Sequence, residues 1–267
     1  DKENKMDKLF SNVKKNMPLA SAVDLDGVKN TIWSVTDPSV IEMIESFMQD
    51  KSVYIADGHH RYETALNYKK YMRDKNGDAP DSVRPYDFVM TMFVNFYDEG
   101  LKIFPTHRVV KVSDDFGENI FLSKVSEDFD VTPLSPDQKN TFFDENGELK
   151  IMFKNVDRYF GFTLKRSVYD RLHNVYRNVN TYILQEIIFK GVLGFQDERI
   201  LKKEGIYFVQ TEEDAEKIGK SERVITFFLK GLNIESVREI SEAGLVMPQK
   251  STYFYPKLQT GLVINEF

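Results

Sequence analysis

The sequence predicts a mixed α/β protein with α+β character, in which helices cover a mixed sheet. Residues 181–266 alternate between stretches of helical and of strand composition, which is typical of this class. Residues 52–73 read as a short apolar strand, an Asp-Gly turn and a helix. With 267 residues, 41% of them hydrophobic, the chain has the material for a sizeable core.

The elements of the first 112 residues follow from hydrophobic periodicity and from helix-start signals. Asp37-Pro38 predicts the start of a helix, because Asp caps free amide donors and Pro suits the first turn. The long apolar run 86–96 predicts a buried strand. The other expected elements are a polar helical lead-in over 1–19, strands over 28–35, 52–56 and 101–104, and helices over 39–49 and 59–73.

The sequence pattern changes near Val112. We therefore expect two parts, one over residues 1–112 and a C-terminal α/β part over residues 113–267. A β-hairpin is predicted from two strands, over 150–154 and 159–165, that flank the turn Asn155-Val156-Asp157-Arg158. The remaining expectations are helices over 114–129, 181–192, 212–218 and 234–243, strands over 131–134, 205–209, 223–229 and 262–266, and a polar loop over 135–147.

Composition excludes several classes of function. The chain has no Cys, which excludes disulfides, thiolate metal ligands and Cys nucleophiles. Its net charge of −6 argues against duplex nucleic acid as a partner, since such binding is driven by basic surface. No apolar run approaches the ~20 residues of a membrane span, and the charged first residues lack the core of a signal peptide. We therefore expect a cytoplasmic protein without a membrane partner.

The sharpest local feature is Ile55-Ala56-Asp57-Gly58-His59-His60-Arg61. A Gly turn that opens directly into a helix presents unpaired backbone amides and the positive end of the helix dipole. Arg61 adds forked donation to phosphate oxygens, and His59 and His60 add donors or acid–base capacity. Asp57 could hold Mg²⁺ or fix the turn through its own hydrogen bond. A phosphate site is the favoured interpretation; ordinary turn chemistry is the alternative.

Two further segments carry candidate groups. Pro105-Thr106-His107-Arg108 repeats the His-Arg pair after a predicted strand. This segment is either a second part of the site or an exposed strand end with solvated charges. In Met247–Leu258, Lys250, Ser251 and Thr252 could donate to a phosphate or carboxylate. The residues alone favour a C-terminal strap whose aromatic side chains pack on the core.

Three segments resemble the hallmark segments of the DUF1015 family. They are Ile55–Ala65, Thr106–Val110 and Met247–Leu262, the last reading Met-Pro-Gln-Lys-Ser-Thr-Tyr-Phe-Tyr-Pro-Lys-Leu-Gln-Thr-Gly-Leu. The family is related to free-serine kinases, which phosphorylate L-serine at the expense of ADP or ATP. The resemblance implies that this chain is the C-terminal portion of a longer member, whose catalytic acidic residue lies in the N-terminal region.

Gly58, His60, Arg61 and Ala65 are also similar to the box of the ParB/sulfiredoxin fold that cradles nucleotide phosphates. This resemblance implies a ParB/sulfiredoxin-like phosphate- or nucleotide-binding part over residues 1–112. It also implies ADP or ATP, or CTP, as ligands together with Mg²⁺ and a small-molecule substrate.

The expected function is that of a nucleotide-dependent phosphotransferase similar to the free-serine kinases, and the expected enzyme is a small-molecule (serine) kinase. Asp57, Gly58, His59, His60, Arg61, His107 and Arg108 would bind phosphate or nucleotide, and His59 and His60 are the catalytic candidates. Lys250, Ser251 and Thr252 are possible additions, and Asp57 is the candidate Mg²⁺ ligand. The alternatives are a nucleotide-sensing module without turnover, and a scaffold in which these motifs only organise the fold.

Overall fold

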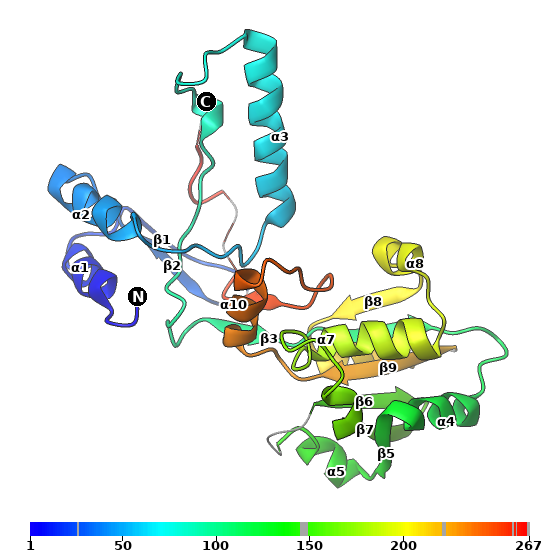
Figure 1. Cartoon of the computed structure of the whole chain (residues 1–267). Helices are drawn as coiled ribbons and strands as arrows, with labels where there is room; N and C mark the ends of the chain where they lie inside the picture. Colours follow the sequence, from blue (N-terminus) through cyan, green and yellow to red (C-terminus); the bar gives the residue numbers. More distant parts are fainter. Residues whose placement is uncertain (26, 145–148, 221–222, 258, 260, 266–267) are drawn as a thin grey trace. The chain divides into compact units, whose positions relative to one another are not determined.

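The computed structural model describes the chain except for residues 26, 145–148, 221–222, 258, 260 and 266–267. As expected, the fold is mixed α/β. It contains two compact units: unit 1 comprises residues 1–101 and 260–267, and unit 2 comprises residues 102–259 (Figure 1). Strand β4 (His107–Lys111) lies in unit 2. The division at residue 112 into two functional parts stays a prediction.

Unit 1 contains a small antiparallel hairpin and helices whose ends follow the expected signals. Helix α2 (Pro38–Met48) begins behind Asp37, whose carboxylate accepts the Ser39 N–H at 2.9 Å, so the predicted helix start is confirmed. Helix α3 (His59–Asn76) begins and ends at glycines in the left-handed region. The other elements are α1 (Lys5–Val13), β1 (Ala20–Val23), β2 (Lys29–Ile32) and the 3₁₀ turn η1 (Pro85–Asp87).

Two strands predicted in unit 1 are wrong. Residues 52–56 form no strand, and residues 88–96, all described, continue from η1 as irregular chain. Phe88, Met90 and Phe93 are more than half exposed, so the run is not buried either. An apolar run becomes a strand only where another segment offers it a backbone ladder, and no described segment pairs with either run.

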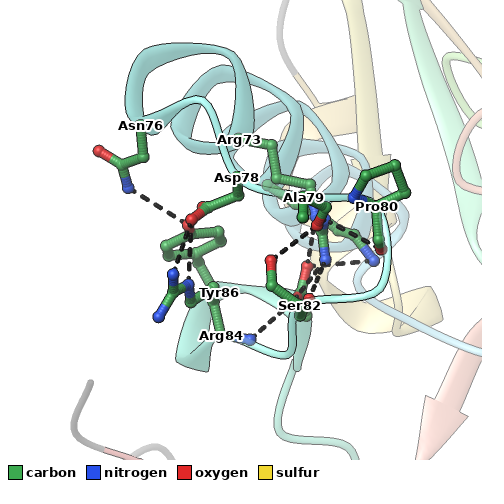
Figure 2. Close-up of polar contacts among 10 residues, drawn as sticks. Arg73, Asn76, Asp78, Ala79, Pro80, Ser82, Arg84 and Tyr86 are labelled. Carbon is green, nitrogen blue, oxygen red and sulfur yellow. Dashed lines mark hydrogen bonds and ion pairs between the residues drawn. The ribbon is translucent and has the colours of Figure 1, made fainter.

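A polar network organises the loop that follows α3 (Figure 2). The Arg73 guanidinium donates to both carboxylate oxygens of Asp87, at 2.9 and 2.8 Å. Asp78 accepts from the Tyr86 hydroxyl and from Arg84 Nε. The hydrogen bonds from Arg73, ahead of those from the Arg84 amide and Lys69, lower the pKa of Asp87 to about 2. These charge-assisted bonds fix the loop against the last turns of α3.

Unit 2 is built on a six-stranded antiparallel sheet in the order β5-β7-β6-β9-β4-β8 (Figure 1). All six residues of β9 are buried, including the polar Thr226, as expected for a largely apolar strand in the centre of a sheet. The predicted hairpin is confirmed as β6 and β7. The bounds are β5 (Phe129–Leu134), β6 (Lys150–Asn155), β7 (Arg158–Leu164), β8 (Ile206–Val209) and β9 (Val224–Leu229).

Helices cover both faces of this sheet. On one face, Phe121 of α4 (Glu118–Asp128) and Ile188 of the π-helix η2 (Leu184–Val192) join the main core with Phe153 and Phe227. On the other face, Ala215 of α9 (Glu212–Gly219) packs in a second cluster of buried residues. The remaining helices are α5 (Pro136–Thr141), α6 (Arg166–Tyr169), α7 (Asn180–Ile183), α8 (Asp197–Lys202) and α10 (Ile234–Glu242).

Three expectations for unit 2 need correction. The predicted loop 135–147 contains α5, because Ser135 and Gln138 form a capping box with bonds of 3.0 and 3.3 Å; residues 145–147 lie outside the described part. The predicted helix 181–192 is α-helical only to Ile183 and then widens into the π-helix η2. The segment predicted as helix 114–129 becomes helical only at Glu118, behind Gly117.

The segment after α10 is a strap across unit 2, as its residues alone favoured. Its strand β10 (Tyr253–Tyr255) pairs antiparallel with β3 (Lys102–Phe104), and Phe254 is buried. The strand predicted over 262–266 does not form over residues 262–265, and residue 266 lies outside the described part.

Candidate functional site

The Asp57–Arg61 segment is a tight turn that opens α3. The Asp57 carboxylate accepts the Gly58 N–H at 2.9 Å, and Gly58 has a φ of 85°. The Arg61 side chain folds back over this glycine: a Cβ at position 58 would lie 2.9 Å from Arg61 Nη2. Only glycine combines this backbone conformation with so close an approach of a guanidinium.

The first amides of α3 have no hydrogen-bond partner among the residues that the structure describes. The first intrahelical bond runs from Tyr62 N–H to the Gly58 carbonyl at 3.0 Å, and no side chain caps this end. Among the described residues, no hydrogen bond or ion pair is made by the side chains of His59 or Arg61. The turn therefore combines free amide donors, the positive end of the helix dipole and a nearby guanidinium.

Both histidines of the turn are exposed. The His60 side chain is 97% exposed, and its Nδ1 lies 3.5 Å from Glu63 Oε2, one turn further along α3. The His60 carbonyl accepts from the Thr64 hydroxyl at 2.7 Å. The imidazoles are thus accessible to a ligand in solution, and the helix beneath them is regular.

His107 lies in a different environment, although it is also followed by Arg. It is 2% exposed in β4, and its Nδ1 accepts the Leu229 N–H of β9 at 3.1 Å. Burial, followed by the charge of Arg108, lowers the pKa of His107 to about 4. His107 is therefore a neutral acceptor inside the sheet at pH 7.

Arg108 is 4% exposed and holds the strap to the sheet. It donates to the Thr106 carbonyl and, at 2.9 Å, to the Lys250 carbonyl, and its guanidinium lies 4.4 Å from the centre of the Phe208 ring. Burial lowers the pKa of Arg108 to about 9. No carboxylate in the described part of the chain forms an ion pair with it.

Within the strap, the three candidate donors differ in exposure. Ser251 is 4% exposed; its Oγ donates to the Pro248 carbonyl at 2.7 Å and lies 2.8 Å from Thr181 Oγ1. Lys250 is exposed and has a positive φ of 56°, and Thr252 is half-buried. The sequence offered no sign of the Thr181 contact, because 70 positions separate the two hydroxyls.

The candidates thus form two groups. Asp57–Arg61 form one turn in unit 1, and Arg108 comes together with Lys250 and Ser251 in unit 2. Across the described ranges, no three His, Asp or Glu side chains gather as a metal-binding group. None of the helices that the structure describes has the length and apolar character to span a membrane.

Comparison with solved structures finds distant similarity. The chain is similar to a conserved hypothetical protein from Pyrococcus furiosus, at 18% identity over 75% of this chain and 68% of that one, with a TM-score of 0.41. It is similar to a free serine kinase mutant in complex with ADP (18% identity, 75% and 66% covered) and to free serine kinase in complex with AMP (16%, 83% and 81%), each with a TM-score of 0.40.

Among curated proteins, none matches this sequence. A family model does match: that of DUF1015, described as a protein of unknown function, over residues 1–182. The matched residues include the Asp57–Arg61 turn and the His107-Arg108 pair. Because the match spans well over half of the chain, this protein belongs to the DUF1015 family.

Proposed function

We propose that this chain carries the phosphate-binding turn of a nucleotide-dependent phosphotransferase. The observation that supports this most is the placement of Arg61 over Gly58. It lies beside the first amides of α3, which are unpaired within the described part of the chain. Amides and a guanidinium directed at one point suit the terminal phosphates of a nucleotide. ADP and ATP are the first candidates, because the Asp-Gly-His-His-Arg segment resembles a hallmark segment of the DUF1015 family, which is related to free-serine kinases. CTP is the third.

In this proposal the turn holds the phosphate donor in place and stabilises charge during transfer. The phosphoanhydride bond of the donor breaks, the oxygen of a small hydroxyl substrate such as serine bonds to phosphorus, and the hydroxyl proton passes to a base. Arg61 and the amides neutralise charge on the transferred group and on the leaving phosphate. His59 and His60 are exposed donors that reach the same phosphates or exchange protons with them.

Mg²⁺ fits this turn as a companion of the nucleotide. Protein sites for Mg²⁺ commonly supply one or two carboxylates, with phosphate oxygens and water as the other ligands. Asp57 is the carboxylate at the turn, where its oxygen accepts the Gly58 N–H. Bound there, Mg²⁺ would neutralise phosphate charge. The predicted roles of His107, Arg108, Lys250, Ser251 and Thr252 at a nucleotide stay predictions; the proposal rests on the turn.

Nucleotide binding tests the turn directly. We expect Arg61→Ala to weaken ADP or ATP binding by at least about tenfold, since a charge-assisted hydrogen bond contributes about 1.5–3 kcal/mol. Lys70→Ala, an exposed charge further along α3, is the matched control and should bind as the wild type does. Isothermal titration calorimetry measures both. Equal affinity of wild type and Arg61→Ala would remove the basis of the proposal.

The two glycines that flank α3 provide a second matched pair. Both have positive φ, so Ala at either position strains the backbone by a similar amount, about 1 kcal/mol. Only at Gly58 would the new Cβ also displace Arg61; around Gly77 nothing lies within 4 Å of it. We expect Gly58→Ala to lose nucleotide affinity and Gly77→Ala to keep it. Equal affinities would show that the position of Arg61 over Gly58 is irrelevant to binding.

Turnover separates the proposal from the nucleotide-sensing alternative. The resemblance implies a catalytic acid N-terminal to this chain, so the full-length protein is incubated with ADP, ATP or CTP, Mg²⁺ and serine. Phosphoserine detected by mass spectrometry supports the phosphotransferase. Nucleotide binding without phosphoserine contradicts it for this acceptor and favours a sensing module.

A further inference from the structure

Arg108 borders a small cavity in unit 2 that is distinct from the Asp57–Arg61 turn. The cavity has a volume of about 10 Å³, close to what one water-sized particle needs. Its polar lining comes from Arg108, Thr181, Gln185 and Gln249, and the rest of its wall is apolar, including Phe189 and Ile206. A single compact occupant fits this space.

The positive charge of Arg108, at the wall of this cavity, is not neutralised by any carboxylate in the described part of the chain. Of the four contacts of its guanidinium with carbonyl oxygens, those to His107 and Gln249 are at 3.5 Å, the outer limit of a hydrogen bond. The Nε–H has no acceptor among the described residues. Carbonyl dipoles and the Phe208 ring offset a buried positive charge only in part, because neither carries a negative charge.

The walls of the cavity are unusual for a simple packing defect. Leu184, Gln185 and Phe189 belong to the π-helix η2, and π-helical turns occur frequently at functional sites. Thr181 is held by Ser251 of the strap, and Pro248 and Gln249 of the same strap close the cavity. The Gln249 side chain is exposed and makes no hydrogen bond within the described part of the chain. Because Gln249 lines the cavity, a rotation of this side chain toward the cavity would bring its amide to a small ion beside Arg108.

We propose that this cavity binds one monatomic anion, chloride in solution, between Arg108 and the Gln249 amide beneath the strap. A halide supplies the negative charge that Arg108 lacks, accepts hydrogen bonds from any direction, and is compact. Water has the right size but no charge. The anion would hold the strap to η2 and β4, so its binding stabilises the fold of unit 2.

Thermal unfolding at constant ionic strength tests the site, with sodium chloride replacing sodium gluconate, whose bulky anion cannot enter the cavity. Above its dissociation constant, an anion that binds only the folded state should raise the Tm by about 3–6 °C for each tenfold increase in concentration. No difference between chloride and gluconate would overturn the proposal.

A matched pair of variants separates this site from general effects of salt. Gln249→Glu places a carboxylate at the cavity, where it repels the anion or replaces it, so the chloride response should disappear. Gln210→Glu makes the same change at an exposed residue that does not line the cavity, and its response should equal that of the wild type. If both variants keep the chloride response, or if both lose it, the response comes from the protein surface as a whole and not from this cavity.

Crystals grown or soaked in sodium bromide give the direct readout. An anomalous difference peak next to the Arg108 guanidinium supports the anion. Density for a water molecule at that position without anomalous signal contradicts it. Bromide peaks confined to the protein surface contradict it as well, because they show adventitious ions only.

Discussion

His107 is a buried base whose protonation is opposed by the fold. Its unfolded-state pKa is near 6.5, and burial lowers the folded-state value to about 4. Between these values the unfolded chain binds a proton that the folded chain does not. The free energy of unfolding therefore falls as the pH falls from 6.5 to about 4, by roughly 3 kcal/mol in total, and this contribution is fully present above pH 6.5.

His107→Asn should remove this pH dependence, since Asn offers an oxygen to the Leu229 N–H but does not titrate. Urea unfolding at pH 4.5 and pH 7 measures the difference. His173→Asn is the control: His173 is exposed, and its Nδ1 also accepts a backbone N–H, that of Val175 at 3.4 Å. An unchanged pH dependence in His107→Asn would show that other groups cause it.

At the scale of elements, the strap from Met247 to Tyr255 is held by a few buried polar contacts. Ser251 joins the strap to Thr181, and Arg108 donates to carbonyl oxygens of the strap. Ser251→Ala removes two hydrogen bonds and leaves the Thr181 hydroxyl without its partner. We expect the free energy of unfolding to fall by about 1–3 kcal/mol.

Ser241→Ala is the matched control for this change. Ser241 is an exposed residue, and its hydroxyl donates to the Val237 carbonyl within its own helix at 2.8 Å. Its loss should therefore change stability by less than about 0.5 kcal/mol. Denaturant titration of both variants gives the comparison. Equal stabilities would mean that the strap contributes little to the folding of unit 2.

At the scale of the whole molecule, the two units differ in burial. None of the described residues of unit 1 is buried, whereas the sheet of unit 2 carries the main core. Amide exchange follows such differences, because amides open most easily where few apolar groups are packed. Hydrogen–deuterium exchange should therefore be faster in α3 and in residues 88–96 than in β6 and β9. Equal protection of the two sets would contradict this.

The sequence by itself determined the features that depend on neighbouring residues. Asp37 predicts the start of α2, and Gly58 predicts the turn before α3, because capping and positive φ need only a few consecutive residues. The hairpin of β6 and β7 and the helices α9 and α10 follow from local periodicity in the same way. The capping box of Ser135 was also readable, although the polar composition around it predicted a loop.

Only the tertiary structure decided which segments found partners. The dipeptide His-Arg occurs at residues 60–61 and again at 107–108. The first copy is exposed at the start of a helix, and the second is buried in a sheet. The apolar run 86–96 predicted a strand, but a strand exists only where a distant segment supplies its hydrogen bonds. Likewise, Thr181 and Gln249 reach the surroundings of Arg108 from 73 and 141 positions away. Burial and pairing depend on such distant contacts, which local sequence patterns do not record.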